Sequence, residues 1–143
     1  MDVVKRSAAA ALVVLALGCG GATEPEVDVS ASFVSAPKEV VVGYGQEIRI
    51  GSSVLRVVFT GVEDSRCPMG VLCIWQGNAA VDLAVAAGSG PSYPLRLNTT
   101  LEPQQADWQG LRFSLVEVRP APVADLPTKK EDYSITLRIE AIR

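Results

Sequence analysis

The chain has 143 residues, enough for one domain, with 13 basic side chains, 16 acidic side chains and no histidine. The lack of histidine excludes every catalytic triad or dyad that uses histidine as a base, and it removes the commonest metal ligand. Outside the N-terminal segment, Lys129-Lys130 is the one basic cluster, so we expect no nucleic-acid partner.

Residues 1–18 have the pattern of a secretory signal peptide. Lys5 and Arg6 give a short positive segment, and residues 8–17 follow as an apolar run without a charge. As a helix, this run would extend about 15 Å, whereas the hydrocarbon core of a bilayer is roughly 30 Å thick. The segment therefore predicts an export signal that is too short to span a membrane.

The end of this segment, Ala16-Leu17-Gly18-Cys19, resembles the lipobox of bacterial lipoproteins. In that family, diacylglycerol is attached to the cysteine thiol, and cleavage then makes the cysteine the first residue. The resemblance implies an exported protein of the bacterial cell envelope that contacts the membrane through lipid on Cys19 and needs no other cofactor. Ala16 stands where leucine is usual, and Gly20 implies the outer membrane in a Gram-negative cell. An ordinary cleaved signal is the alternative.

Residues 19–37 are expected to form a lipid-anchored tether, because the glycines and the proline near its start favour an open chain. Within it, residues 27–34 alternate apolar and polar side chains, which would suit an edge strand as well as an ordered linker. Cleavage before Cys19 would remove two of the 13 basic and one of the 16 acidic side chains, leaving a net charge of −4.

From residue 38 to residue 143, apolar side chains recur at every second position, the period of a half-buried strand. The clearest segments are 48–50, 55–59, 81–85, 93–97, 111–115 and 133–139, and clusters of glycine, serine and proline separate them. The sequence Trp108-Gln109-Gly110 predicts a turn before one strand, with the indole over the edge of the core. The domain is therefore expected to be all-β: an antiparallel β-sandwich, Ig-like or similar, of about seven to eight strands.

Two cysteines, Cys67 and Cys73, lie close together in the chain and predict a disulfide, because an exported protein meets oxidising conditions. The bridge would close a loop of seven residues and contribute roughly 2–2.5 kcal/mol by chain entropy. Pro68 and Gly70 supply turn residues inside this loop.

The polar residues before the loop can be satisfied locally. Asp64 and Ser65 are expected to bond to nearby backbone N–H groups, and Arg66 to pair with Asp64 or Glu63. Trp75 is expected to pack its ring near the disulfide at the start of the next strand. A disulfide-closed turn with local hydrogen bonds would account for the whole segment.

The run Asp64-Ser65-Arg66-Cys67-Pro68, followed by Cys73, Trp75, Gly77 and Asn78, resembles a motif of small uncharacterised bacterial lipoproteins. In those proteins, the motif lies in a β-rich domain behind a lipobox. The resemblance covers residues 64–78. It implies a cellular location and an architecture, and it implies no activity.

Three sharper interpretations of the loop stay open. A redox role for the cysteines is disfavoured by their C-x5-C spacing and the lack of a following helix. A calcium site would need Glu63, Asp64 and Asn78, whose spacing matches no known calcium loop. A binding role is the strongest, because a preorganised loop loses less entropy on binding; its contact candidates are Arg66, Met69, Val71 and Leu72.

We therefore expect a non-enzymatic binding or structural module of the cell envelope, with no catalytic or metal-ligating residue identified and an envelope protein as its partner class. One alternative is a ligand- or protease-binding protein that acts through the Cys67–Cys73 loop. Another is an envelope enzyme based on carboxylates such as Glu63 and Asp64. The sequence predicts neither a ligand nor an oligomeric state.

Overall fold

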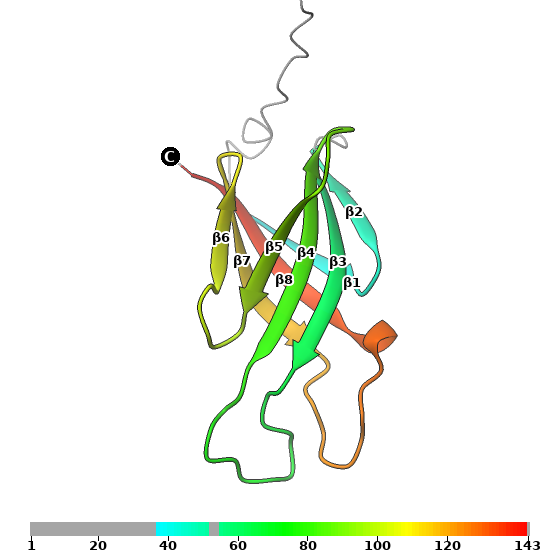
Figure 1. Ribbon diagram of the computed structural model, residues 1–143, viewed down its shortest axis with the longest axis vertical. Helices are drawn as coiled ribbons and strands as arrows, with labels where there is room; N and C mark the ends of the chain where they lie inside the picture. Colours follow the sequence, from blue (N-terminus) through cyan, green and yellow to red (C-terminus); the bar gives the residue numbers. More distant parts are fainter. Residues whose placement is uncertain (1–36, 52–54, 143) are drawn as a thin grey trace, which may run out of the picture.

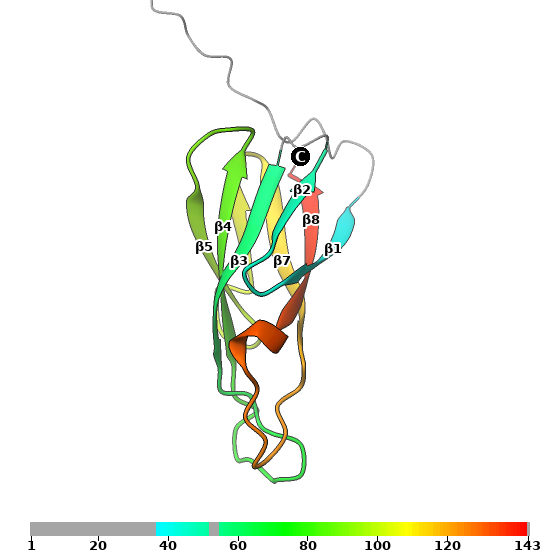
Figure 2. The same cartoon turned by 90° about the vertical axis from the view of Figure 1, so that its right-hand side faces the viewer.

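The computed structural model describes residues 37–51 and 55–142, so the signal segment, Cys19 and the segment 27–34 lie outside it. The described residues form two four-stranded antiparallel sheets that pack face to face (Figures 1 and 2). In spatial order, the first sheet contains β1 (Lys38–Gly43), β8 (Ser134–Ala141), β7 (Leu111–Arg119) and β6 (Gln105–Trp108), and the second contains β2 (Glu47–Ile50), β3 (Leu55–Asp64), β4 (Ala79–Ala87) and β5 (Tyr93–Asn98). The predicted antiparallel sandwich is confirmed. One short 3-10 helix, η2 (Lys130–Asp132), precedes β8, and no helix in the described part could cross a membrane.

The hydrophobic core lies between the two sheets and is built by alternate residues of the long strands. Phe59 of β3, Leu97 of β5, Phe113 of β7 and Leu137 of β8 are completely buried. These are residues that the period of two placed on the inner faces. Among the described residues, the core cluster and the side chains packed against it come from residues 40–141.

Strand β6 was not predicted from the period of two in the sequence. It has four residues, and only Ala106 and Trp108 face the core. Gln109 and Gly110, with φ of 46° and 72°, form the turn to β7, and positive φ at both positions suits a tight hairpin. The indole of Trp108 packs at the core edge and stacks on Tyr93 with 6.5 Å between ring centroids, so its predicted position is confirmed.

A β-bulge in β3 changes which face its last residues present. Pairing with β4 skips Thr60, so one additional residue is inserted in β3 at this point. Before the bulge, Val57 and Phe59 point into the core. After it, the side chain of Asp64 points inward and is 6% exposed, whereas that of Glu63 points outward and is 73% exposed.

The sandwich has two unlike ends. Lys38 pairs with Ile139 near the end of β8, so the chain enters the domain at that end. The long loops 65–78 and 120–129 project from the other end (Figure 2, green and orange). The motif residues therefore lie at the end farthest from the start of β1.

Candidate functional site

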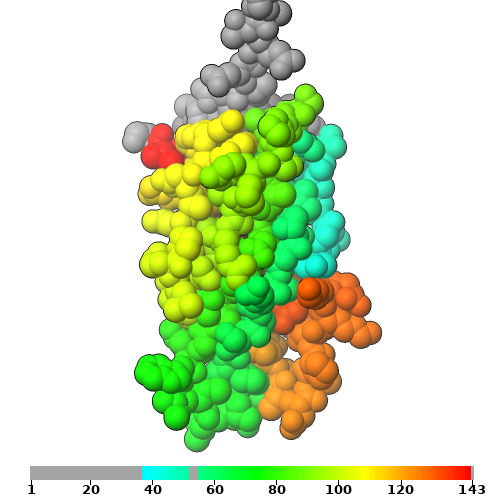
Figure 3. Space-filling view, in the orientation of Figure 1, coloured from blue at the N-terminus to red at the C-terminus, as the bar shows by residue number. Residues whose placement is uncertain are grey.

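The motif residues build a projecting loop between β3 and β4. We call residues 65–78 the tip loop. Its neck consists of residues 65–66 and 77–78 together with Asp64, the last residue of β3. Its apolar tip consists of Met69, Val71, Leu72, Ile74 and Trp75. Figure 3 shows the tip loop as a green knob at one end of the molecule. Sequence reasoning identified the loop, and the structure separates it into a braced base and an exposed end.

The neck continues the β3–β4 pairing beyond the strands. The N–H of Ser65 donates to the carbonyl of Asn78 at 2.7 Å, and that of Cys67 donates to the carbonyl of Gln76 at 2.9 Å. The hydroxyl of Ser65 also donates to the carbonyl of Asn78, at 2.9 Å. Gly77 has a φ of +74°, and a Cβ there would lie 1.9 Å from the carbonyl oxygen of Ser65. Only glycine fits this close crossing.

Arg66 joins the two sheets. Its Nε and Nη2 donate to the two carboxylate oxygens of Asp64 at 2.8 and 2.7 Å. Its Nη1 donates to the carbonyl of Val118 and its Nη2 to that of Pro120, at 2.7 and 2.6 Å. The pairing with Asp64, and not with Glu63, resolves the two options that the sequence left open. With its side chain 18% exposed and its guanidinium bonded to Asp64, Arg66 belongs to the neck, apart from the exposed contact candidates Met69, Val71 and Leu72.

The Asp64 carboxylate is stabilised in its charged form. Burial is the largest influence and would raise its pKa. The hydrogen bonds from the side chain and backbone N–H of Arg66, the charge of Arg66 and the hydroxyl of Tyr133 outweigh burial and hold the pKa below its ordinary value of 3.8. The pKa of Tyr133 is raised, first by burial and then by its hydrogen bond to Asp64. At neutral pH, the cluster therefore holds an ion pair and a neutral phenol.

Asn78 ties the neck to the loop that follows β5. Its Nδ2 donates to Oδ1 of the buried Asn98 at 2.8 Å, and its Oδ1 accepts from the N–H of Thr100 at 3.1 Å. The hydroxyl of Thr100 donates to the carbonyl of Gly77 at 2.7 Å. Both polar atoms of the Asn78 side-chain amide therefore take part in structural hydrogen bonds.

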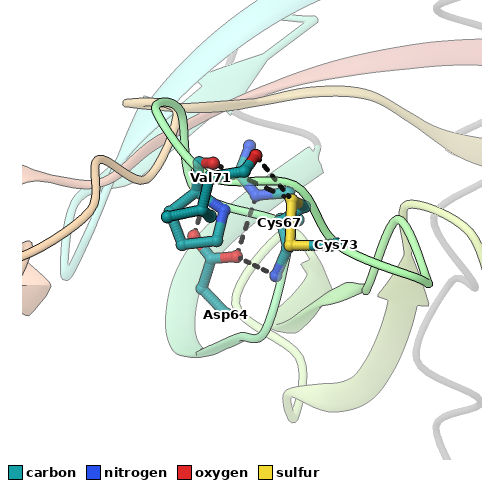
Figure 4. Close-up of a disulfide and its surroundings, with 6 residues drawn as sticks. Asp64, Cys67, Val71 and Cys73 are labelled. Carbon is teal, nitrogen blue, oxygen red and sulfur yellow. Dashed lines mark hydrogen bonds and ion pairs between the residues drawn. A yellow bond between two sulfur atoms is a disulfide. The ribbon is translucent and has the colours of Figure 1, made fainter.

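The predicted disulfide between Cys67 and Cys73 is confirmed, with 5.9 Å between the two Cα atoms (Figure 4). Pro68 follows Cys67 within the closed loop, and the carbonyl of Val71 lies 3.9 Å from Sγ of Cys67. In the described chain, the cysteines lie in a loop between two strands and no helix follows them. The helix dipole that lowers a thiol pKa in redox motifs is therefore missing from this site.

The tip loop is attached to the second loop at the same end. The N–H of Met69 donates to the carbonyl of Pro122 at 2.9 Å, and the N–H of Ala124 donates to the carbonyl of Met69 at 3.1 Å. The second loop adds the exposed side chains of Val123 and Leu126 near the tip. The tip is therefore held at its neck and along one side.

The outermost side chains of the tip are apolar and in solvent. Leu72 is fully exposed, Ile74 is 91% exposed and Trp75 is 81% exposed. The expectation that Trp75 packs near the disulfide at the start of a strand was wrong, because its ring projects into solvent and β4 begins only at Ala79. Hydrogen bonds hold the neck instead. Ile74 was not among the contact candidates. The uncharged run from Cys67 to Asn78 is the signal that could have identified it.

The carboxylates expected for an enzyme or a calcium site, Glu63 and Asp64, are each bound by an arginine. Adjacent residues of a strand point to opposite faces, and Glu63 binds Arg96 on the outer face while Asp64 binds Arg66 on the inner one. Two open pockets flank the neck: one of about 510 Å³ is lined by Glu63, Asp64 and Asn78 among others, and one of about 470 Å³ is lined by Asp64 and Tyr133 among others. Within residues 37–51 and 55–142, no three cysteine or acidic side chains are grouped so that they could hold a metal ion.

Comparison of the chain with protein-family models, with curated proteins and with solved structures finds no match in any of the three.

Proposed function

We propose that the chain is a lipid-anchored lipoprotein of the bacterial cell envelope, at the outer membrane in a Gram-negative cell, and that it acts as a non-enzymatic binding module. The lipobox-like sequence that ends at Cys19 supports the anchor. The apolar tip supports the binding role. The one observation that carries this role is that Leu72, Ile74 and Trp75 are held in solvent on a braced loop.

Holding such side chains in water has a free-energy cost. Burying a large apolar side chain stabilises a protein by about 1.5–3 kcal/mol relative to leaving it exposed. Single exposed apolar residues scattered over a surface are ordinary, whereas several gathered in one place mark a surface that is covered when the protein works. Here Met69, Val71 and Leu72 are adjoined by Ile74 and Trp75 within one short loop.

The bracing of the loop supports the same role. The Arg66–Asp64 ion pair, the Asn78 amide and the disulfide act at the base, so the base of the loop is fixed before any partner binds. A loop that is already ordered loses less conformational entropy when it binds. The arrangement therefore favours recognition by the tip over a purely structural turn.

The anchor is tested by the intact mass, without reduction, of protein extracted from membranes of its native host. We expect the mass of residues 19–143 plus lipid, less the two hydrogens lost in forming the disulfide. Cys19→Ala should release the protein from the membrane fraction. A lipid-free mass for the membrane-extracted protein would contradict the proposal.

The binding role is tested by placing a photo-crosslinking amino acid at Leu72 in cells. The matched control is Val41, an exposed apolar residue on β1, away from the tip. We expect adducts from position 72 and none from position 41. Equal labelling at the two positions, or no adduct at position 72, would count against a recognition surface at the tip.

A further inference from the structure

We infer that the partner of the tip is a phospholipid bilayer, into whose interface the tip inserts. This inference rests on the proposed function, because it names what the tip binds. It makes the tip a second membrane contact, separate from the lipid expected on Cys19.

The shape of the tip favours a fluid partner. Leu72, Ile74 and Trp75 are exposed almost completely, so each side chain projects without being covered by its neighbours. Figure 3 shows the loop as a convex projection. A bilayer closes around separate projecting side chains, whereas a folded protein would need a matching cavity for each of them. Tryptophan beside aliphatic residues is also the composition of membrane-interface contacts.

The outer part of the tip loop carries no charge. No charged residue occurs from Cys67 to Asn78. The nearest one along the chain, Arg66, is turned inward, where Asp64 and two carbonyl groups bind its guanidinium. On the second loop, Asp125 is exposed next to Ala124, whose N–H donates to the carbonyl of Met69, and this carboxylate would have to stay in water when the tip inserts. Because charged groups are expensive to take into a bilayer, their exclusion from residues 67–78 suits this partner.

The backbone limits the depth of insertion. In the described structure, the backbone N–H groups of residues 70–75 donate to no protein acceptor. Unpaired N–H groups are not tolerated in the hydrocarbon region, but water and headgroups can satisfy them at the interface. We therefore place the tip at an interfacial depth of about 5–10 Å.

The expected tether allows both contacts to be made on one bilayer. A chain of the length of residues 19–37 can reach at most about 65 Å. The ten residues of β3 extend about 33 Å. The domain can therefore tilt until its tip meets the membrane that holds the lipid. Two signals also give firmer attachment than one.

The net charge expected after cleavage, −4, allows apolar insertion of the tip to be distinguished from electrostatic adsorption. A negative protein gains nothing from anionic headgroups. We therefore expect binding to neutral phosphatidylcholine vesicles that is at least as strong as binding to vesicles containing phosphatidylglycerol. Added salt should not weaken either interaction.

The test uses the unlipidated mature chain, residues 19–143 with Cys19→Ser. The additional substitution Trp108→Phe leaves Trp75 as the one tryptophan, because the chain has two. Phosphatidylcholine vesicles should sediment the protein and shift the emission of Trp75 to shorter wavelength. Leu72→Ser and Ile74→Ser should each weaken partitioning by about tenfold, whereas Val41→Ser should leave it unchanged.

The inference is overturned if the parent protein does not bind vesicles, if binding survives both tip substitutions, or if Val41→Ser lowers it equally. A discrete protein adduct from position 72 in cells, without vesicle binding, would overturn the lipid inference and leave the proposed binding role standing. Failure of both the adduct and the vesicle binding would remove both proposals.

Discussion

Arg66 binds Asp64 through two parallel hydrogen bonds, from Nε to Oδ1 at 2.8 Å and from Nη2 to Oδ2 at 2.7 Å. The same guanidinium donates to the carbonyls of Val118 and Pro120, so it connects the end of β3 with the end of β7. Paired charges with satisfied hydrogen bonds are what a half-enclosed site requires. The motif residues of the neck therefore hold the two sheets together beneath the tip.

Replacing Arg66 should destabilise the domain, because Arg66→Met leaves the inward-pointing carboxylate of Asp64 without its cation. We expect a loss of about 2–4 kcal/mol in the free energy of unfolding, measured by urea denaturation. The matched control is Arg112→Met, since Arg112 binds Asp107 with the same paired geometry at the surface. Solvent screens that pair, so its loss should matter little. Equal losses in the two variants would show that the neck pair has no special role.

Stability should depend on pH through Asp64, whose pKa is lower in the folded protein than its ordinary value of 3.8. A lowered pKa means that the folded state favours the carboxylate. Its stabilising contribution is therefore complete above about pH 4 and is lost as the pH falls through the folded pKa. Asp64→Asn should be clearly less stable than the parent at pH 7, and the difference should shrink below pH 3.8. A difference independent of pH would rule out this ion pair as its source.

Gly77 should tolerate no side chain. In Gly77→Ala, the new Cβ would meet the carbonyl of Ser65 at 1.9 Å, in addition to the cost of a positive φ. We expect a loss of about 3 kcal/mol or more, or a rearranged neck. Gly70→Ala is the control within the same loop, because Gly70 also has a positive φ but nothing lies within 4 Å of its Cβ position. That variant should lose only about 1 kcal/mol, and the reverse order would refute the crowding argument.

Removing the disulfide should weaken the domain without unfolding it. The bridge closes a short loop outside the core, so Cys67→Ser with Cys73→Ser should cost roughly 2–2.5 kcal/mol. The core between the sheets contains neither cysteine. Urea denaturation of the double variant should therefore remain cooperative, with a lower midpoint. Loss of the folded state at room temperature would show that the bridge supports the sandwich itself.

The sandwich could be predicted from the sequence because its signal is local. Alternation in segments such as 111–115 and 133–139 reports which side chains face the core, and it needs no knowledge of strand order. The short spacing of Cys67 and Cys73 predicted their bridge in the same way. Strand β6 was missed because two inward residues are too few to define a period.

By itself, then, the sequence determined the all-β architecture, its inner faces and its closed loop, while the lipid anchor stays a prediction that lies outside the described residues. Only the tertiary structure decided that Asp64 points inward, because the bulge at Thr60 shifts the alternation by one residue. Only the tertiary structure supplied the partners of the neck, since Val118 and Tyr133 lie 52 and 69 residues beyond the groups they bind. The tertiary structure also decided that Trp75 is exposed. Whether an apolar loop residue packs or projects depends on how the ends of the two sheets meet, and no local pattern records that.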